Sequence, residues 1–191
     1  MRAYFEDLAS LAAGAERTIG PALTKAAALV ADAALAGRTT LVFGNGGSAT
    51  QAQHFAAELV VRYKDDRRAL PAVALAADVS VLTACANDYG FDTVFSRQVE
   101  ALGRPGDVAV GLSTSGTSPN VVKALETARA RGLSTVLMTG EKGLAEAAKW
   151  DVGLVVPSSE TAHVQELHLA AIHLICRHVD EELKRRNRGA R

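Results

Sequence analysis

The chain has little cysteine, no excess of either charge and no long apolar segment. Its two cysteines, Cys85 and Cys176, each lie in an apolar stretch, which favours buried reduced thiols and argues against a disulfide framework. Lys plus Arg and Asp plus Glu number 21 each, so no overall field draws the chain toward nucleic acid or an anionic membrane. We therefore expect neither partner, and any bound anion must be held by local groups.

The absence of long apolar runs also bears on location. No run approaches the ~20 residues that span a bilayer. The first residues, MRAYFEDLAS, place acidic side chains where a signal peptide would be apolar. We expect a cytoplasmic protein, and its 191 residues suit one domain with its own hydrophobic core.

Short apolar runs alternate with helical segments along the chain. The first 36 residues are rich in Ala and Leu, and Gly20-Pro21 divides them into two expected helices. Helical periodicity between most of the later apolar runs, and the near-continuous apolarity of those runs, predict a parallel sheet covered on both faces. The fold class is therefore three-layer α/β. The five expected strands are residues 39–43, 71–75, 107–112, 134–138 and 151–156.

The helices at both ends of the chain predict self-association. From Ser159 onward we expect a long helix with apolar residues around much of its circumference. This helix and the two N-terminal helices need more apolar surface than one small sheet offers, so we expect a homo-oligomer built on helices. The last residues, KRRNRGAR, are typical of a solvated basic tail. The single domain divides into N-terminal helices (1–36), an αβα core that binds the ligand (37–187) and a tail (188–191).

A glycine-rich loop, GNGGSATQAQ (residues 44–53), follows the first expected strand. Its glycines let backbone N–H groups approach an anion, and the next helix adds its positive N-terminal end. The loop also contains G-x-G-x-x-A, which overlaps the dinucleotide fingerprint, and that fingerprint expects an acidic residue about 20 positions farther on, at the end of the second strand. Asp65 and Asp66 precede that strand and Asp78 comes too late. The dinucleotide interpretation is therefore the weaker one.

A second polar loop, STSGTSPN (residues 113–120), follows the third expected strand and opens another helix. Ser118 suits the N-cap and Pro119 the first helical position. Capping needs one hydroxyl, whereas this loop carries several hydroxyl groups close together, enough to make several hydrogen bonds to phosphate oxygens at once. Two such loops at the carboxyl ends of parallel strands, where α/β folds bind ligands, favour a phosphorylated small molecule over turn chemistry alone.

Two helical segments carry side chains suited to acid/base or metal chemistry. His54 and Glu58 are i and i+4, so they project from one helix face, with a structural hydrogen bond as the alternative. Gln165 and His173 are eight residues apart, ~80° around the long helix, and can reach one broad side. Together the four form a possible N/O set for zinc or a similar divalent ion. Arg62 follows Glu58 by four, and an exposed ion pair between them is the alternative to a ligand contact.

The segment of residues 84–98 holds the pair Asn87-Asp88 in a turn-like stretch ahead of an expected helix. Asx-turn or capping chemistry is one interpretation. The other is a buried Asp that faces a polyol and accepts hydrogen bonds from sugar hydroxyls. The residues alone leave both open.

Five ordered motifs resemble those of the phosphoheptose isomerases, that is sedoheptulose 7-phosphate isomerases, of the sugar isomerase (SIS) domain superfamily. The resemblance covers nearly the whole chain, and five motifs in order are more specific than any single loop. It implies the SIS fold, a five-stranded parallel sheet flanked by helices, with N-terminal helices used in oligomerisation. It also implies a homotetramer whose active sites lie at subunit interfaces. The motifs are GNGGS (44–48), AQHFAAEL (52–59), ANDYGFDTVFSRQVEALGRPGD (86–107), STSGTSPNV (113–121) and VQELHLAAIH (164–173).

The resemblance further implies an activity and a set of site residues. The family interconverts D-sedoheptulose 7-phosphate and D-glycero-D-manno-heptose 7-phosphate by proton transfer through an enediol, without an organic cofactor. By implication Glu58 is the base and His173 the acid. The implied ligands of one Zn²⁺ per subunit are His54, Glu58, Gln165 and His173. The expected contacts to the sugar phosphate are Asn45, Gly46, Gly47, Ser48, Glu58, Arg62, Asn87, Asp88, Ser113, Thr114, Ser115, Ser118 and Gln165.

One segment departs from the family pattern, and other functions compete with the isomerase. The segment TGEKGLAEAAKWD (139–151) is shorter and lacks a glycine pair, which leaves its loop shape open. One alternative is a non-catalytic SIS protein, such as the relative that binds the replication initiator DnaA or a regulator that senses sugar phosphates. Those proteins lack the catalytic pair, whereas this chain has it as Glu58 and His173. The ANDYGFD match (86–92) disfavours an isomerase of shorter sugar phosphates. Nothing in the residues selects the pathway.

Overall fold

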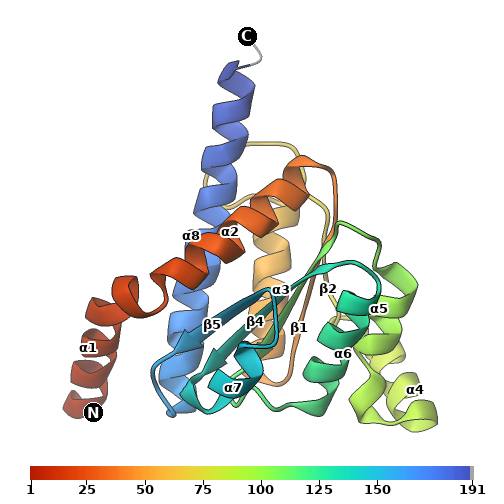
Figure 1. Cartoon of the computed structure of the whole chain (residues 1–191), viewed down its shortest axis with the longest axis horizontal. Helices are drawn as coiled ribbons and strands as arrows, with labels where there is room; N and C mark the ends of the chain where they lie inside the picture. The colour runs from red at the N-terminus through yellow and green to blue at the C-terminus, as the bar shows by residue number, and fades with distance from the viewer. Residues whose placement is uncertain (190–191) are drawn as a thin grey trace.

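A parallel sheet of five strands lies at the centre of the fold, in the order β2-β1-β3-β4-β5 (Figure 1). The computed structural model describes residues 1–189. Each strand overlaps one of the five runs expected from the sequence, and every pairing is parallel. The predicted α/β class and the five strands are therefore confirmed. The strands are β1 (Thr40–Gly44), β2 (Ala72–Ala74), β3 (Val108–Ser113), β4 (Ser134–Gly140) and β5 (Val152–Val156).

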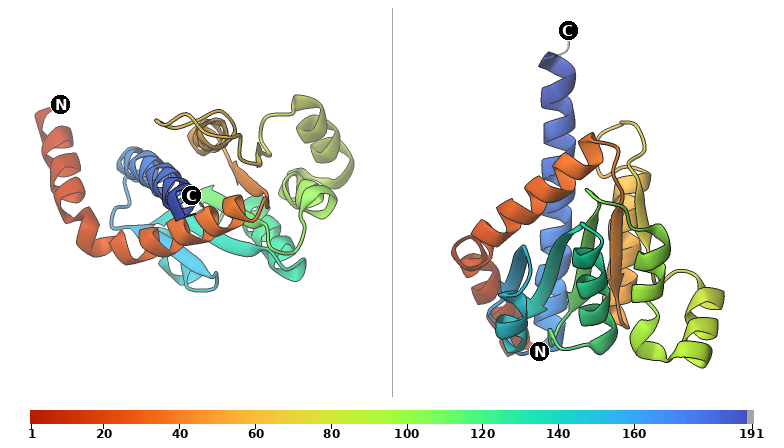
Figure 2. Two further views of the ribbon diagram at one scale, coloured as in Figure 1. Left: turned by 90° about the horizontal axis from the view of Figure 1, so that it is seen from above. Right: turned by 45° about the vertical axis from the view of Figure 1, so that its right-hand side comes forward.

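Helices cover both faces of the sheet, as the views in Figure 2 show. One face carries α2 (Gly20–Leu35), α3 (Gly47–Val60) and α8 (Thr161–Gly189). The other face carries α4 (Val79–Tyr89), α5 (Ser96–Leu102), α6 (Pro119–Ala130) and the short α7 (Leu144–Ala147). Two 3₁₀ turns, η1 (Phe91–Thr93) and η2 (Glu141–Gly143), precede α5 and α7.

The strands are apolar on both faces because successive side chains enter opposite cores. In β1, Val42 belongs to the core beneath α2, α3 and α8, whereas Leu41 and Phe43 belong to the core on the other side. In β4, Met138 and Leu137 divide in the same way. The near-continuous apolarity that predicted a covered parallel sheet is thus a consequence of two separate cores.

The two N-terminal helices form as expected but differ in burial. Helix α1 (Arg2–Thr18) lies beside the β5 edge of the sheet (Figures 1 and 2). It has no buried residue and its Phe5 is 66% exposed, although Leu8 and Leu11 pack partly against the core. Helix α2 packs on α8 and the sheet through Val30 and neighbouring alanines. Among residues 1–189 no single helix has the length and apolarity to cross a membrane, and α1 and α2 reach that threshold only as a pair bent by 68°. An oligomeric role for α1 stays a prediction.

The C-terminal helix is longer than the sequence division assumed. Helix α8 runs from Thr161 to Gly189 and extends past the sheet (Figure 1). Residues 188 and 189, assigned to a tail, therefore belong to the helix. Residues 190–191 of that expected tail lie outside the described part of the chain.

His168 on α8 is a titratable group inside the core beneath this helix. Its side chain is fully buried, at 0% exposure. Burial lowers its pKa from 6.5 to about 4, against a smaller raising effect from the backbone of Thr139. The folded chain therefore holds His168 neutral at pH values where the unfolded chain protonates it.

We expect this histidine to make the fold sensitive to acid. Its neutral burial contributes stability that is fully present above pH 6.5 and is lost as the pH falls toward about 4. The free energy of unfolding should drop by about 3 kcal/mol over that window, at about 1.4 kcal/mol per pKa unit. Urea unfolding of the wild type and of His168→Leu, across this pH range, measures the effect. The wild type should lose stability more steeply than the variant, and parallel slopes would contradict the assignment.

Candidate active site

A pocket of ≈ 300 Å³ opens at the carboxyl ends of β1 and β3. These strands are neighbours, with β2 on one side of them and β4 and β5 on the other, so the pocket lies at the switch point where α/β sheets bind ligands. The structure thus brings together the two polar loops predicted from the sequence. The lining consists of Asn45, Gly46, Gly47, Ser48, Leu112, Ser113, Thr114, Ser118, Thr161 and Gln165.

The first loop presents the N-terminus of α3 to this pocket. Gly46, which precedes the helix, has a φ of 55°, a left-handed conformation that suits glycine. The side chain at this N-cap is only a hydrogen atom, so no side-chain oxygen covers the first turn of the helix. Ser48, 3% exposed, lies in that turn and lines the pocket. The positive end of the helix dipole and this hydroxyl suit an anion such as a phosphate.

The hydroxyl groups of the second loop bind one another. Ser118 occupies the N-cap of α6 as expected, but its hydroxyl makes no capping bond. The predicted N-cap position is confirmed, as is Pro119 at the first helical position, but Ser118 Oγ lies 2.8 Å from Ser113 Oγ instead of bonding to the backbone of the helix. The lining includes Ser113, Thr114 and Ser118 but not Ser115, whose Oγ accepts a bond from the Thr117 N–H. Paired hydroxyls at the pocket can turn to donate to phosphate oxygens.

An amide pair that the sequence did not predict joins the two loops. Asn45 Nδ2 donates to Asn120 Oδ1, and Asn120 Nδ2 donates back to Asn45 Oδ1, both at 2.9 Å. Asn120 is 2% exposed and lies in the first turn of α6. The pair fixes the first loop against α6, so that Asn45 lines the pocket in one orientation. Asn120 belonged to a quoted motif, but only its contact with Asn45, 75 residues away in sequence, reveals this role.

The side chain of Gln165 fills the space that a Cβ on Gly47 would occupy. A Cβ built on Gly47 would lie 2.7 Å from Gln165 Nε2 and 2.9 Å from Oε1. Gln51 Nε2 donates to the Gln165 backbone carbonyl at 2.6 Å, which ties α3 to α8 beside the pocket. Gln51 is a further site residue that spacing alone did not single out. Because Gly47 lies so close to the Gln165 side chain, this position takes a glycine, although helix propensity alone favours alanine.

Substitution of Gly47 should impair binding through this contact. We expect Gly47→Ala to displace the Gln165 amide and to raise KM for the substrate about tenfold, with the fold retained because alanine favours a helix. Steady-state kinetics and thermal unfolding measure the two effects. Gly14→Ala is the matched control, since a Cβ on Gly14 of α1 meets nothing within 4 Å. An unchanged KM in Gly47→Ala would show that the Gln165 amide, in its position against Gly47, does not contribute to substrate binding.

Three candidate catalytic or metal-binding side chains meet where α3 faces α8. His54 Nε2 lies 3.3 Å from Glu58 Oε1 and 3.1 Å from His173 Nε2. The Tyr63 ring stacks on His173, with centroids 5.7 Å apart and an interplanar angle of 24°. The Glu58 side chain is 21% exposed, and its Oε2 atom is buried without a hydrogen-bond partner in the described part of the chain. The cluster therefore pairs a carboxylate that has one uncommitted oxygen with two imidazoles.

The donor chemistry of this cluster fits a divalent metal. Two ligands of one tetrahedral zinc, each ~2.0–2.1 Å from it, lie ~3.3 Å apart. The contacts from His54 to Glu58 and to His173 match that spacing. Among residues 1–189, however, no three His, Cys, Asp or Glu side chains already surround one ion position. Gln165, the fourth expected ligand, packs on Gly47 instead.

Three expected substrate contacts lie away from the pocket in the single chain. Arg62 follows the end of α3, is exposed and donates to the Lys64 carbonyl, so the alternative ion pair with Glu58 does not form. Asn87 and Asp88 are exposed and bond to each other at 2.8 Å. They lie inside α4, so the expected turn ahead of a helix is wrong: the helix continues to Tyr89 and ends where Gly90 adopts a φ of 90°.

Comparison with known proteins gives consistent matches. The SIS domain family model matches residues 3–140. A phosphoheptose isomerase from Geobacter sp. (strain M21) is 51% identical over 183 residues, which cover 96% of this chain and 93% of that protein. The structure of a phosphoheptose isomerase from Neisseria gonorrhoeae is similar, with a TM-score of 0.88, 44% identity, and coverage of 94% of this chain and 96% of that one. A phosphoheptose isomerase structure from Francisella tularensis gives a TM-score of 0.90 and 35% identity at the same coverage.

Proposed function

Because the chain belongs to the phosphoheptose isomerases of the SIS domain family, we propose that it interconverts D-sedoheptulose 7-phosphate and D-glycero-D-manno-heptose 7-phosphate. One observation carries the proposal: α3 begins at the anion pocket and bears His54 and Glu58, which meet His173 of α8. Ser48 and His54 are six residues apart, ~9 Å along the helix axis. In a heptose 7-phosphate the phosphate and the reacting carbons C1 and C2 lie at opposite ends, so this spacing suits a long sugar phosphate.

The reaction needs one proton moved between neighbouring carbons and one between neighbouring oxygens. Glu58 takes the proton from C1 of the ketose while His173 protonates the carbonyl oxygen at C2, which gives the enediol. Glu58 then returns its proton to C2, and His173 removes a proton from the C1 oxygen to form the aldehyde. Atoms and electrons balance without an oxidant or an organic cofactor, and both residues end in their starting protonation states.

The two oxygens of Glu58 lie in different surroundings, which suits a divided role. Oε1 faces His54 at 3.3 Å, whereas Oε2 is buried without a partner. A carboxylate bound to a cation is a weaker base, so one group that both holds zinc and abstracts a proton carries a conflict. We assign Oε1 to the histidine and metal side and Oε2 to the proton transfer.

Zinc is the proposed metal, held by His54, Glu58 and His173 with Gln165 as the fourth ligand. The spacing of His54 Nε2 from Glu58 Oε1 and from His173 Nε2 supports this donor set. When bound, the ion would polarise the substrate's carbonyl and hydroxyl oxygens. Gln165 would first have to turn its amide from Gly47 toward the histidines.

The proposed assembly is a homotetramer in the cytoplasm, with each site shared between subunits. Helix α1 has no buried residue in the single chain, and exposed apolar side chains on it such as Phe5 need another surface to cover them. Arg62, Asn87 and Asp88, which are exposed and do not line the pocket of their own chain, would then contribute to the site of a neighbouring copy.

An assay of the purified chain tests the activity directly. Sedoheptulose 7-phosphate is supplied without a nicotinamide cofactor, at several zinc loadings, and the aldoheptose 7-phosphate product is followed by NMR. We expect its signals to grow until equilibrium, and fructose 6-phosphate to react far more slowly. Absence of turnover at every zinc loading, with the heptulose phosphate still bound, would favour a non-catalytic sugar-phosphate sensor.

A further inference from the structure

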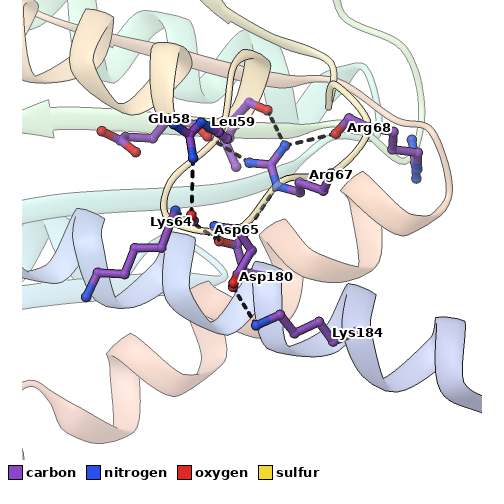
Figure 3. A network of polar contacts seen from close by, with 9 residues as sticks. Glu58, Leu59, Lys64, Asp65, Arg67, Arg68, Asp180 and Lys184 are labelled. Atoms are coloured by element: carbon purple, nitrogen blue, oxygen red, sulfur yellow. Dashed lines mark hydrogen bonds and ion pairs between the residues drawn. The ribbon is translucent and has the colours of Figure 1, made fainter.

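A buried ion pair joins the end of α3 to α8, and its network is drawn in Figure 3. The Arg67 Nε donates to Asp180 Oδ1 at 2.8 Å, and the two side chains are only 8% and 3% exposed. The same guanidinium donates from Nη2 to the Glu58 carbonyl at 2.7 Å and from Nη1 to the Leu59 carbonyl at 2.9 Å. We call Arg67 and Asp180 the clamp.

The clamp binds carbonyl groups that the helix itself leaves free. Helix α3 ends at Val60, so the carbonyls of Glu58 and Leu59 lie in its last turn and have no partner within the helix. A guanidinium suits this place because its planar fork donates several bonds at once and its charge faces the negative end of the helix dipole. Arg67 thereby fixes the backbone of the residue that carries the proposed base.

Stability alone is a weak reason for such a pair. The cost of removing both charges from water offsets much of their attraction, and apolar side chains of similar volume are often as stable. What the clamp supplies is a defined distance between two helices. Asp180 lies seven residues after His173 on α8, about two turns, so the clamp connects the Glu58 backbone to the helix that bears His173.

We propose, resting on the proposed function, that Arg67 and Asp180 are positioning residues that set the Glu58 carboxylate against His54 and His173. Two contacts depend on this positioning: Glu58 Oε1 lies 3.3 Å from His54 Nε2, and His173 Nε2 lies 3.1 Å from the same atom. A displacement of about 1 Å in such a contact can slow a reaction about 100-fold. The sugar phosphate would still bind, because the anion pocket lies at the opposite end of α3.

The double variant Arg67→Met/Asp180→Leu tests the proposal, since it removes both charges and leaves no unpaired charge in the core. We expect it to fold, with kcat for sedoheptulose 7-phosphate about 10- to 100-fold lower and KM changed by less than about threefold. Arg67→Lys keeps the positive charge but loses the planar guanidinium that binds two carbonyls of α3 and Asp180 at once, so we expect kcat to be about tenfold lower. This single variant carries the test if the double variant does not fold.

The matched control is Asp65→Asn/Lys184→Gln, which removes an exposed ion pair of 2.7 Å between the same loop and the same helix. It should keep the wild-type kcat. A second readout needs no substrate: the imidazole NMR signals of His54 and His173 should shift in the clamp variants and stay unchanged in the control. Folded clamp variants with wild-type kcat and unshifted signals would overturn the inference. A wild type without isomerase activity would instead overturn the proposed function, and the NMR signals would still report on the clamp.

Discussion

Replacement of Glu58 by glutamine should lower kcat about a thousandfold or more and leave the fold intact. Glutamine has nearly the same shape but cannot accept the proton from carbon, and a positioned general base contributes about 10²- to 10⁴-fold to such a reaction. The partner-free Oε2 of Glu58 is the atom whose loss matters most. NMR measures the effect in two ways, by product formation and by deuterium incorporation from solvent at C1 and C2. Both should fall together.

The control for this substitution is the same chemical change at an exposed helical position. Glu126→Gln on α6 alters a solvent-exposed carboxylate far from α8 and should keep the wild-type rate. KM in Glu58→Gln should stay close to the wild-type value, because the phosphate pocket is formed by other residues. If Glu58→Gln kept more than a tenth of the wild-type kcat, the proton would have to pass to another group.

The sheet was predictable because its signal is local. Runs such as residues 107–112 are apolar at every position, which happens when a strand is covered on both faces. The edge strand β2 is shorter than expected, and Val73 is 39% exposed, because one side of β2 has no neighbouring strand. The break between α1 and α2 follows in the same way from Gly20-Pro21.

The candidate site was predictable only where its residues follow strands. Strand order brings the two loops together, so spacing along the sequence located the pocket. The differences from expectation depend on which of several nearby partners a polar side chain takes, or on the precise end of a helix. The hydroxyl of Ser118 turns to Ser113 instead of capping α6, and Asn87 continues a helix that only Gly90 ends.

The residues that the sequence did not reveal are held by long-range polar contacts. Arg67 and Asp180 are 113 residues apart, and each stands in a segment rich in other charges. Nothing local separates Arg67 from Arg68 next to it, because only the fold determines which one is buried. The same holds for the amide pair, because Asn45 lies in the loop after β1 and Asn120 lies in the first turn of α6, 75 residues away in sequence.

Replacement of His173 by glutamine should lower kcat about 100-fold or more, an effect second only to that expected for Glu58→Gln. Its imidazole lies across from the carboxylate, with Nε2 3.1 Å from that of His54, and Tyr63 stacks on its face. Glutamine can donate a hydrogen bond but cannot exchange a proton with the substrate oxygens, so the enediol would form without a general acid. Steady-state kinetics at saturating zinc measure the loss. His178→Gln, five residues farther along α8, is the control and should keep the wild-type rate.

A variant of His54 separates the acid role of His173 from metal binding, because both imidazoles belong to the proposed zinc set. Zinc bound per subunit should fall in both His54→Gln and His173→Gln, since each loses one imidazole. At saturating zinc His54→Gln should recover most of its kcat, whereas His173→Gln should not, because only His173 transfers a proton. Equal recovery in the two variants would reduce His173 to a metal ligand and leave the oxygen proton transfers to solvent or to a residue of a neighbouring subunit.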